Sequence, residues 1–351
     1  MSIETFIIVS VIKTVIALIV LLTAVAYSVW LERKVVGHIQ NRWGPTRVGP
    51  FGLLQPLADG VKFLFKEDLT PLHVYKPLYI AAPMIAVTFA LTSISVIPIG
   101  NWVTVGGIHT PLEITDVNIG LLIILGITSL GVYGVALAGW SSNSKYSLLG
   151  ALRASAQMVS YEVALGLSLI GVLIMTGSFS LREIVDAQGG TFWGFIPRWN
   201  IFRGQIVAFF IYLMAAYAET NRIPFDLPEA ETELVAGYHT EYSAMKFAMF
   251  FMAEYANMIT VAAVASLLFL GGWHSPFGEE RWLHAPVIVM AILPVFWFVA
   301  KIFVFLFVYI WVRGTLPRFR YDQLMAFGWK FLLPLAIANL VVTALVVAIR
   351  S

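Results

Sequence analysis

Eight long apolar runs constrain the fold of this chain more than any other feature. A helix needs about 20 apolar residues to cross the hydrocarbon core of a bilayer, and the runs lack the strict alternation of barrel strands. We therefore predict an all-α integral membrane protein with eight transmembrane helices. The expected spans are about Phe6–Trp30, Leu78–Ile99, Val117–Trp140, Ala156–Thr176, Ile201–Ala218, Ser243–Leu270, Pro286–Val312 and Phe331–Ile349.

The composition excludes a soluble globular enzyme. Of the 351 residues, 59% are apolar and only 12% are charged, whereas about a quarter of a soluble domain is charged. The chain has no Cys, so a disulfide, an Fe–S cluster or a Cys-type zinc site is excluded. The six His lack metal-ligand spacing and the chain has no nucleotide-binding glycine motif, so no metal or cofactor site is predicted. If electron transfer is involved, a partner must carry the metal centres.

The basic residues predict the orientation. Fifteen of the 22 lie in the odd-numbered loops or at their helix ends, and basic loops stay in the cytoplasm. We therefore expect one polytopic domain, residues 1–351, with both termini outside.

The first cytoplasmic loop, residues 31–77, contains a short amphipathic helix. Its apolar face carries Leu53, Leu54, Leu57, Val61 and Leu64, and its polar face carries Gln55, Asp59, Lys62 and Lys66. Two interpretations are open: a helix lying flat on lipid with solvated charges, or a helix that covers a cavity and points its charges inward.

The third cytoplasmic loop, residues 219–242, is acidic. Apolar residues alternate with its acids, which favours packing over a freely solvated loop. Crowded carboxylates have raised, coupled pKa values, so a proton relay and a cation site are both open. The acids are Glu219, Asp226, Glu229, Glu231, Glu233 and Glu241.

Three ionisable residues lie inside the predicted spans and are functional candidates, because an unpaired charge at that depth is costly. Glu162 lies about two turns from the cytoplasmic end of its helix. Glu254 and Lys301 each lie about 11 residues from such an end, roughly 16 Å deep. Equal depth predicts an ion pair, which could be functional or a purely structural salt bridge. A fourth residue, Lys13, lies near an outer end and can reach the surface.

Two long segments resemble the family formed by the H subunits of proton-pumping NADH-quinone oxidoreductase, respiratory complex I. They are residues 52–67 (GLLQPLADGVKFLFKE) and 224–237 (PFDLPEAETELVAG). Shorter matches are residues 32–34, 138–146 and 317–323, so the resemblance covers nearly the whole chain. It implies a membrane protein that contains no redox centre and lines a quinone chamber. Such a protein also begins a charged path toward the pumping subunits.

The resemblance implies roles for individual residues, with quinone as the substrate and no catalytic residue or bound cofactor on this chain. The quinone chamber would include Glu32, Arg33, Arg42, Asp59, Lys62, Lys66 and Arg222. The proton or charge path would include Glu162, Glu219, Asp226, Glu229, Glu231, Glu233, Glu254 and Lys301.

The resemblance also implies partners and a location. Hydrophilic-arm subunits would carry FMN, the terminal Fe–S cluster and the Tyr and His of the quinone site. Small membrane-arm subunits, antiporter-like subunits and lipids would complete the surroundings, without nucleic acid. A bacterial inner membrane is expected in preference to a mitochondrial one. Two alternatives stay open: the equivalent component of a membrane-bound hydrogenase or other donor oxidoreductase, and a stand-alone cation transporter.

Overall fold

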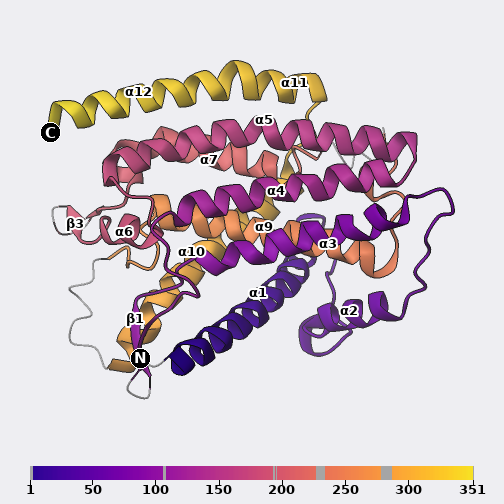
Figure 1. Ribbon diagram of the computed structural model, residues 1–351, viewed down its shortest axis with the longest axis horizontal. Coiled ribbons are helices and arrows are strands. Elements are labelled where there is room, and N and C mark those ends of the chain that lie inside the picture. Colours follow the sequence, from indigo (N-terminus) through magenta and orange to yellow (C-terminus); the bar gives the residue numbers. More distant parts are fainter. Residues whose placement is uncertain are drawn as a thin grey trace.

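The chain folds into a bundle of long helices in this computed structural model (Figure 1). The structure describes residues 3–105, 108–192, 194, 196–226, 234–277 and 287–350. Within that part of the chain, eight helices are long and apolar enough to cross a membrane. The predicted integral membrane fold is therefore confirmed. The spans are Glu4–Ile39, Lys76–Val96, Gly120–Ser141, Lys145–Thr176, Ile201–Glu219, Ala244–Phe269, Ile292–Thr315 and Tyr321–Arg350.

The helices and strands of each kind follow this order along the chain. The α-helices are α1 (Ile3–Ile39), α2 (Gln55–Phe65), α3 (Lys76–Thr92), α4 (Gly120–Ser141), α5 (Lys145–Thr176), α6 (Leu181–Asp186), α7 (Ile206–Glu219), α9 (Ala244–Phe269), α10 (Val287–Thr315), α11 (Tyr321–Ala326) and α12 (Leu333–Arg350). Short 3-10 or π-helical segments are Pro50–Gly52, Ser93–Val96, Ile201–Gln205, Gly237–His239 and Phe327–Leu332. Two antiparallel hairpins pair β1 (Trp102–Val105) with β2 (Ile108–Pro111) and β3 (Thr191–Phe192) with β4 (Ile196–Pro197).

Helix α9 is the centre of the bundle. It packs against α1, α3, α7 and α10, and its buried face is rich in alanine, including Ala253, Ala256, Ala262 and Ala265. Small residues let helix backbones approach closely. Close packing matters in a membrane because an apolar side chain is as stable against lipid as against another helix. By contrast, α1 and α12 lie at the periphery of the bundle (Figure 1) and expose most of their apolar side chains, as expected for helices that face lipid or partner subunits.

A close glycine contact fixes the neighbouring pair α3 and α4. A Cβ added at Gly134 would lie 2.9 Å from the Cβ of Ala86, which is closer than two carbon atoms can approach without a shift. Helix α5 continues the layer beyond α4 and ends at Gly177, whose left-handed backbone (φ 71°) lets its N–H bond to the carbonyl of Leu173.

Several helix ends differ from the predicted ones. Helix α1 continues to Ile39, so Arg33 lies on a helix and not in the expected loop 31–77. Helix α5 begins at Lys145 and has 32 residues, about 48 Å, which exceeds the hydrocarbon thickness of about 30 Å. The helix is therefore longer than a hydrocarbon core requires, and the apolar pattern alone placed its start too late.

The predicted amphipathic helix is present as α2, and it packs against α1 and α9. Its apolar side chains Leu57 and Leu64 are each 66% exposed, whereas Asp59 is partly covered. Asp59 therefore faces α1, whereas Lys62 and Lys66 on the same polar face are exposed, and the apolar edge is left uncovered by this chain. Only part of the polar face points inward, so both interpretations of this helix stay open.

Candidate functional site

A buried cluster of charged side chains joins four segments that lie far apart in the sequence. Glu32 on α1 accepts contacts from Arg222, whose Nη1 lies 3.2 Å from Glu32 Oε2, and from Arg313 on α10. The hydroxyl of Tyr255 on α9 donates to the same Oε2 at 2.8 Å. Glu32 and Arg222 are 9% and 5% exposed, so these two side chains have little contact with water, whereas Arg313 is partly exposed.

Arg222 connects this cluster to a second carboxylate. Its Nε forms an ion pair with Glu254 on α9, and its guanidinium carbon lies 4.2 Å from the ring centroid of Tyr255. Two arginines and two carboxylates are thus grouped with no formal net charge. Buried charges are tolerated when they are paired and hydrogen-bonded in this way, and a planar guanidinium suits a position shared by two carboxylates.

The chain around Arg222 is held by α5. Gln157, which is fully buried, donates from Nε2 to the carbonyl oxygens of Ala218 and Phe225, each at 2.8 Å. Two bonds from one side chain fix both sides of the turn that carries Arg222. The turn follows directly from the end of α7, which explains why a loop residue reaches the centre of a helical bundle.

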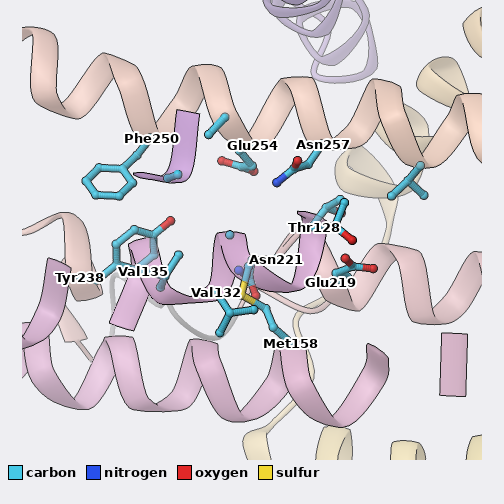
Figure 2. A pocket seen from close by; sticks show the side chains of 15 residues that line it. Thr128, Val132, Val135, Met158, Glu219, Asn221, Tyr238, Phe250, Glu254 and Asn257 are labelled. Atoms are coloured by element: carbon cyan, nitrogen blue, oxygen red, sulfur yellow. The ribbon is translucent and has the colours of Figure 1, made fainter. Parts of the chain in front are cut away.

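Glu254 also faces a small cavity. The cavity has a volume of about 50 Å³, enough for a few water molecules. Glu254 and Asn257 approach it from α9, and Glu219 approaches from the end of α7 (Figure 2). Thr128 of α4 lies beside Glu219 (Figure 2). Two carboxylates, an amide and a hydroxyl are therefore gathered around a space that water can fill.

A further carboxylate follows Glu219. Glu162 on α5 lies close enough to Glu219 to interact with it electrostatically, and it accepts a hydrogen bond from the hydroxyl of Ser129 on α4. The carboxylates of α1, α9, α7 and α5 therefore follow one another through the bundle, joined by Arg222 and the cavity. Such an arrangement can exchange protons or rearrange charge, because each group lies near another polar group or a hydrated space.

The residues expected in the quinone chamber are divided between this cluster and the surface. Arg33 on α1 forms an ion pair with Asp59 on α2 at 2.6 Å, and Gln55 donates to the other oxygen of Asp59 at 3.0 Å. The ion pair joins α2 to α1, and the hydrogen bond, which lies within α2, holds the Asp59 carboxylate in place. Three further candidates, Arg42, Lys62 and Lys66, are exposed.

The predicted ion pair between Glu254 and Lys301 is wrong. Lys301 lies over the ring of Trp199, 4.4 Å from its centroid, and Glu254 pairs with Arg222 instead. Equal residue counts did not give equal depth, because Lys301 reaches the opposite end of α9, about 24 Å from Glu254 along that helix. Its ammonium group donates to the carbonyl oxygens of Leu270 (2.6 Å), Gly272 (2.7 Å) and His274 (2.8 Å).

Part of the acidic loop can be placed. Asp226 is buried and forms an ion pair with Arg318 at 3.1 Å. This contact holds the start of the acidic loop against the segment that follows α10. Glu229, Glu231 and Glu233 lie outside the described residues.

Sequence reasoning missed a second buried ion pair, which lies near the other end of the bundle. Arg182 of α6 lies 2.6 Å from Glu113 and over the rings of Trp102 and Trp273. Burial raises the pKa of the Glu113 carboxyl, and the hydrogen bond from Arg182 opposes that rise. Lys13 donates to the carbonyl of Glu113 at 3.1 Å. Both partners are loop or short-helix residues without a pattern, so the sequence carried no signal for the pair.

The charged side chains do not form a metal-type cluster. The described ranges contain no group of three or more His, Cys, Asp and Glu side chains that could hold a metal ion. The conspicuous feature of the site is therefore a row of paired carboxylates and arginines.

Comparison with known proteins gave matches along nearly the whole chain. A family model described as NADH dehydrogenase matches residues 12–344. The chain is 71% identical to an H subunit of the NADH-quinone oxidoreductase of Koribacter versatilis, over 99% of both chains. It is 51% identical to an H subunit of the same enzyme from Solibacter usitatus, over 98% of both, and 51% identical to the H subunit from Protochlamydia amoebophila, over 92% of both.

Proposed function

The chain belongs to the NADH dehydrogenase family, and we propose that it is the membrane subunit of an NADH-quinone oxidoreductase. In this role it lines the quinone chamber and begins the charged path that couples quinone reduction to proton translocation. The names of the relatives, all of them H subunits of that enzyme, support the role. They favour it over the hydrogenase and transporter alternatives.

One observation carries the proposal: charged groups follow one another from Glu32 at the end of α1 to Glu162 in α5. Glu32 shares Arg222 with Glu254, and Glu254 faces the same cavity as Glu219. Charges buried in a membrane bundle are costly, and a row of them across four helices is far more than packing requires.

In the proposed mechanism, Arg222 is the switch. Negative charge created by quinone reduction near α1 attracts the arginines of the Glu32 cluster. Arg222 then moves toward Glu32 and away from Glu254. Glu254, without its counter-ion, takes a proton from the hydrated cavity, and the change passes to Glu219 and on to Glu162. Each step moves a proton or an ion pair between groups that form an ion pair, share the cavity or interact electrostatically.

The quinone chamber is proposed to lie between α1 and α2. The ion pair between Arg33 and Asp59 holds the polar edge of α2 toward α1. Aromatic and aliphatic side chains next to it, including Phe51 and Leu57, are exposed and suit an apolar quinone ring and tail. Arg42, Lys62 and Lys66 belong to the mouth in this proposal.

The acidic loop belongs to the cytoplasmic end of the same path. Asp226, Glu229, Glu231 and Glu233 are proposed to respond to charge in the chamber. We leave Lys301 out of the path, because its ammonium group binds carbonyl oxygens and not Glu254.

Partners supply everything that this chain cannot hold. Because the chain has no Cys, the terminal Fe–S cluster is proposed on a neighbouring hydrophilic subunit, which also offers the Tyr and His of the quinone site, and FMN on another. Small membrane subunits and antiporter-like subunits continue the charged path. The proposed location is a bacterial inner membrane with both termini outside, in keeping with the basic residues at the odd-numbered loops.

Substitution in the assembled enzyme tests the mechanism. Glu254→Gln and Glu219→Gln remove titratable groups while preserving shape, and each is expected to lower coupled quinone reduction and proton pumping roughly tenfold, within the usual range of coupling energies. Asp322→Asn is the matched control, because Asp322 is exposed and its one ion pair among the described residues is with nearby Arg320.

Full coupled activity in both cavity variants would refute the proposed path. Mass spectrometry of co-purified subunits distinguishes the first alternative, since NADH-binding partners support the proposal and hydrogenase subunits contradict it. Reconstitution of the isolated chain distinguishes the second, since autonomous transport would contradict the proposal.

A further inference from the structure

A basic hollow lies at the opposite end of the bundle from the Glu32 cluster. It has a volume of about 630 Å³ and is lined by Arg198, Arg203 and Arg350, together with Phe192 and Phe202. These residues come from the β3–β4 hairpin, the start of the fifth span and the end of α12. Figure 1 shows that β3, the end of α5 and the C-terminal end of α12 lie at the same edge of the bundle. This site is remote from the charged path described above.

The positive charge in the hollow is not neutralised within the described residues, because none of the ion pairs there involves its three arginines. Arg203 donates to the carbonyl of Ala187 at 3.2 Å and to Asn200 at 3.4 Å, which are neutral acceptors. It also lies close enough to Arg198 to be repelled by it. Three guanidinium groups around one hollow form a site for a phosphate-type anion, which accepts charge-assisted hydrogen bonds from several arginines at once.

Exposed apolar side chains continue from the hollow along two adjacent helices. Phe202 and Ile206 lie one helical turn apart at the start of the fifth span, and they are 56% and 51% exposed. Leu345 and Ile349 are exposed at the end of α12, which packs against α7. A ligand that fits both features carries a negative headgroup and long apolar chains.

We propose that the hollow binds the headgroup phosphate of an anionic phospholipid, with the acyl chains along α7 and α12. Two sources of a phosphate group are conceivable, a lipid and a free ion. The apolar rows favour the lipid, because inorganic phosphate would gain nothing from them. The charge favours an anionic lipid over a zwitterionic one, because the ammonium group of phosphatidylcholine would be repelled by three arginines.

Native mass spectrometry of the full chain tests this proposal. The chain is released from nanodiscs that contain equal amounts of phosphatidylglycerol and phosphatidylcholine, and the retained lipid is counted. The wild type is expected to retain phosphatidylglycerol. Arg198→Gln/Arg203→Gln/Arg350→Gln is expected to bind it roughly 100-fold more weakly, at about 1 kcal/mol per basic residue near a membrane surface.

Three controls keep the result interpretable. Arg320→Gln removes an exposed arginine at the other end of the bundle and is expected to leave retention unchanged. The single variant Arg198→Gln changes an exposed side chain, and partial loss of lipid in that variant separates binding from failure to fold. Inorganic phosphate at millimolar concentration is expected not to displace the lipid.

Three outcomes would overturn the proposal. They are equal retention of the two lipids by the wild type, unchanged retention by the triple variant, and displacement of the lipid by inorganic phosphate alone.

Discussion

Arg222 is the residue whose loss should be most costly. Arg222→Met removes the shared counter-ion of Glu32 and Glu254 and replaces it with an apolar chain of similar length. Removing one partner of a buried ion pair typically costs about 3–5 kcal/mol. Arg222 is 5% exposed, so solvent screening does not reduce this cost much. Because Arg313 still pairs with Glu32, we expect a loss near the lower end, about 3 kcal/mol.

The loss can be measured by equilibrium unfolding of the full chain in mixed micelles with increasing dodecyl sulfate. The chain has 11 Trp, so intrinsic fluorescence follows the transition. Arg222→Lys is the conservative control. It keeps the charge but not the planar fork that two carboxylates share, so its loss should be smaller than that of Arg222→Met.

A double-mutant cycle distinguishes a lost ion pair from a simple packing defect. If Arg222 stabilises the bundle through Glu254, then Arg222→Met/Glu254→Gln should be more stable than the sum of the two single effects, by about 1–3 kcal/mol. Strict additivity, or a loss below about 1 kcal/mol for Arg222→Met, would refute the reasoning that these two side chains form one electrostatic unit.

Three other predictions concern separate parts of the molecule. Lys301→Met should destabilise the bundle by about 3 kcal/mol, because three buried or partly buried carbonyl oxygens lose this donor. Unfolding in the same micelles measures the loss, and an unchanged midpoint would contradict it. Burial raises the pKa of Tyr242 from 10.0 to about 12, so the protonated phenol stabilises the folded state fully below pH 10, and this stability is lost as the pH rises through about 12. Tyr242→Phe should therefore lose less stability at alkaline pH than the wild type. Equal pH profiles of the two proteins would contradict this prediction. Because the chain has no Cys, the single variants Arg198→Cys and Arg320→Cys can be labelled on intact cells with a maleimide that does not cross the membrane. Only the Arg198→Cys variant should react. Reaction of the Arg320→Cys variant alone would show the opposite orientation.

The number of membrane helices could be predicted from the sequence because it depends on a local quantity, the length of an apolar run. The ends of those helices could not. Helix α5 begins at Lys145 and α1 continues through Arg33, although both stretches are more polar than the apolar runs that predict the spans. Hydropathy indicates which residues can face lipid, but a helix ends where its backbone hydrogen bonds end, and hydropathy does not predict that position.

The charged residues of the site could be predicted, but their partners could not. Glu32 meets Arg222 and Arg313 across 190 and 281 residues of sequence, and no spacing rule links positions that far apart. The expected partnership of Glu254 with Lys301 assumed that depth can be counted from helix ends. It failed because the segment after α9 turns back and places its carbonyl oxygens beside Lys301.

The two ends of the bundle hold their charges in different ways, and this difference bears on the direction of the proposed path. Both intramembrane lysines bind backbone carbonyl oxygens: Lys13 binds those of Pro111 and Glu113, and Lys301 binds three others. A carbonyl oxygen has no proton to exchange, so neither lysine continues a relay from Glu254. The carboxylates of the proposed path lie nearer the other end of the bundle and lead from α1 through α9 and α7 to α5. We therefore propose that the path crosses the bundle from helix to helix, toward neighbouring subunits, and not the membrane within this chain.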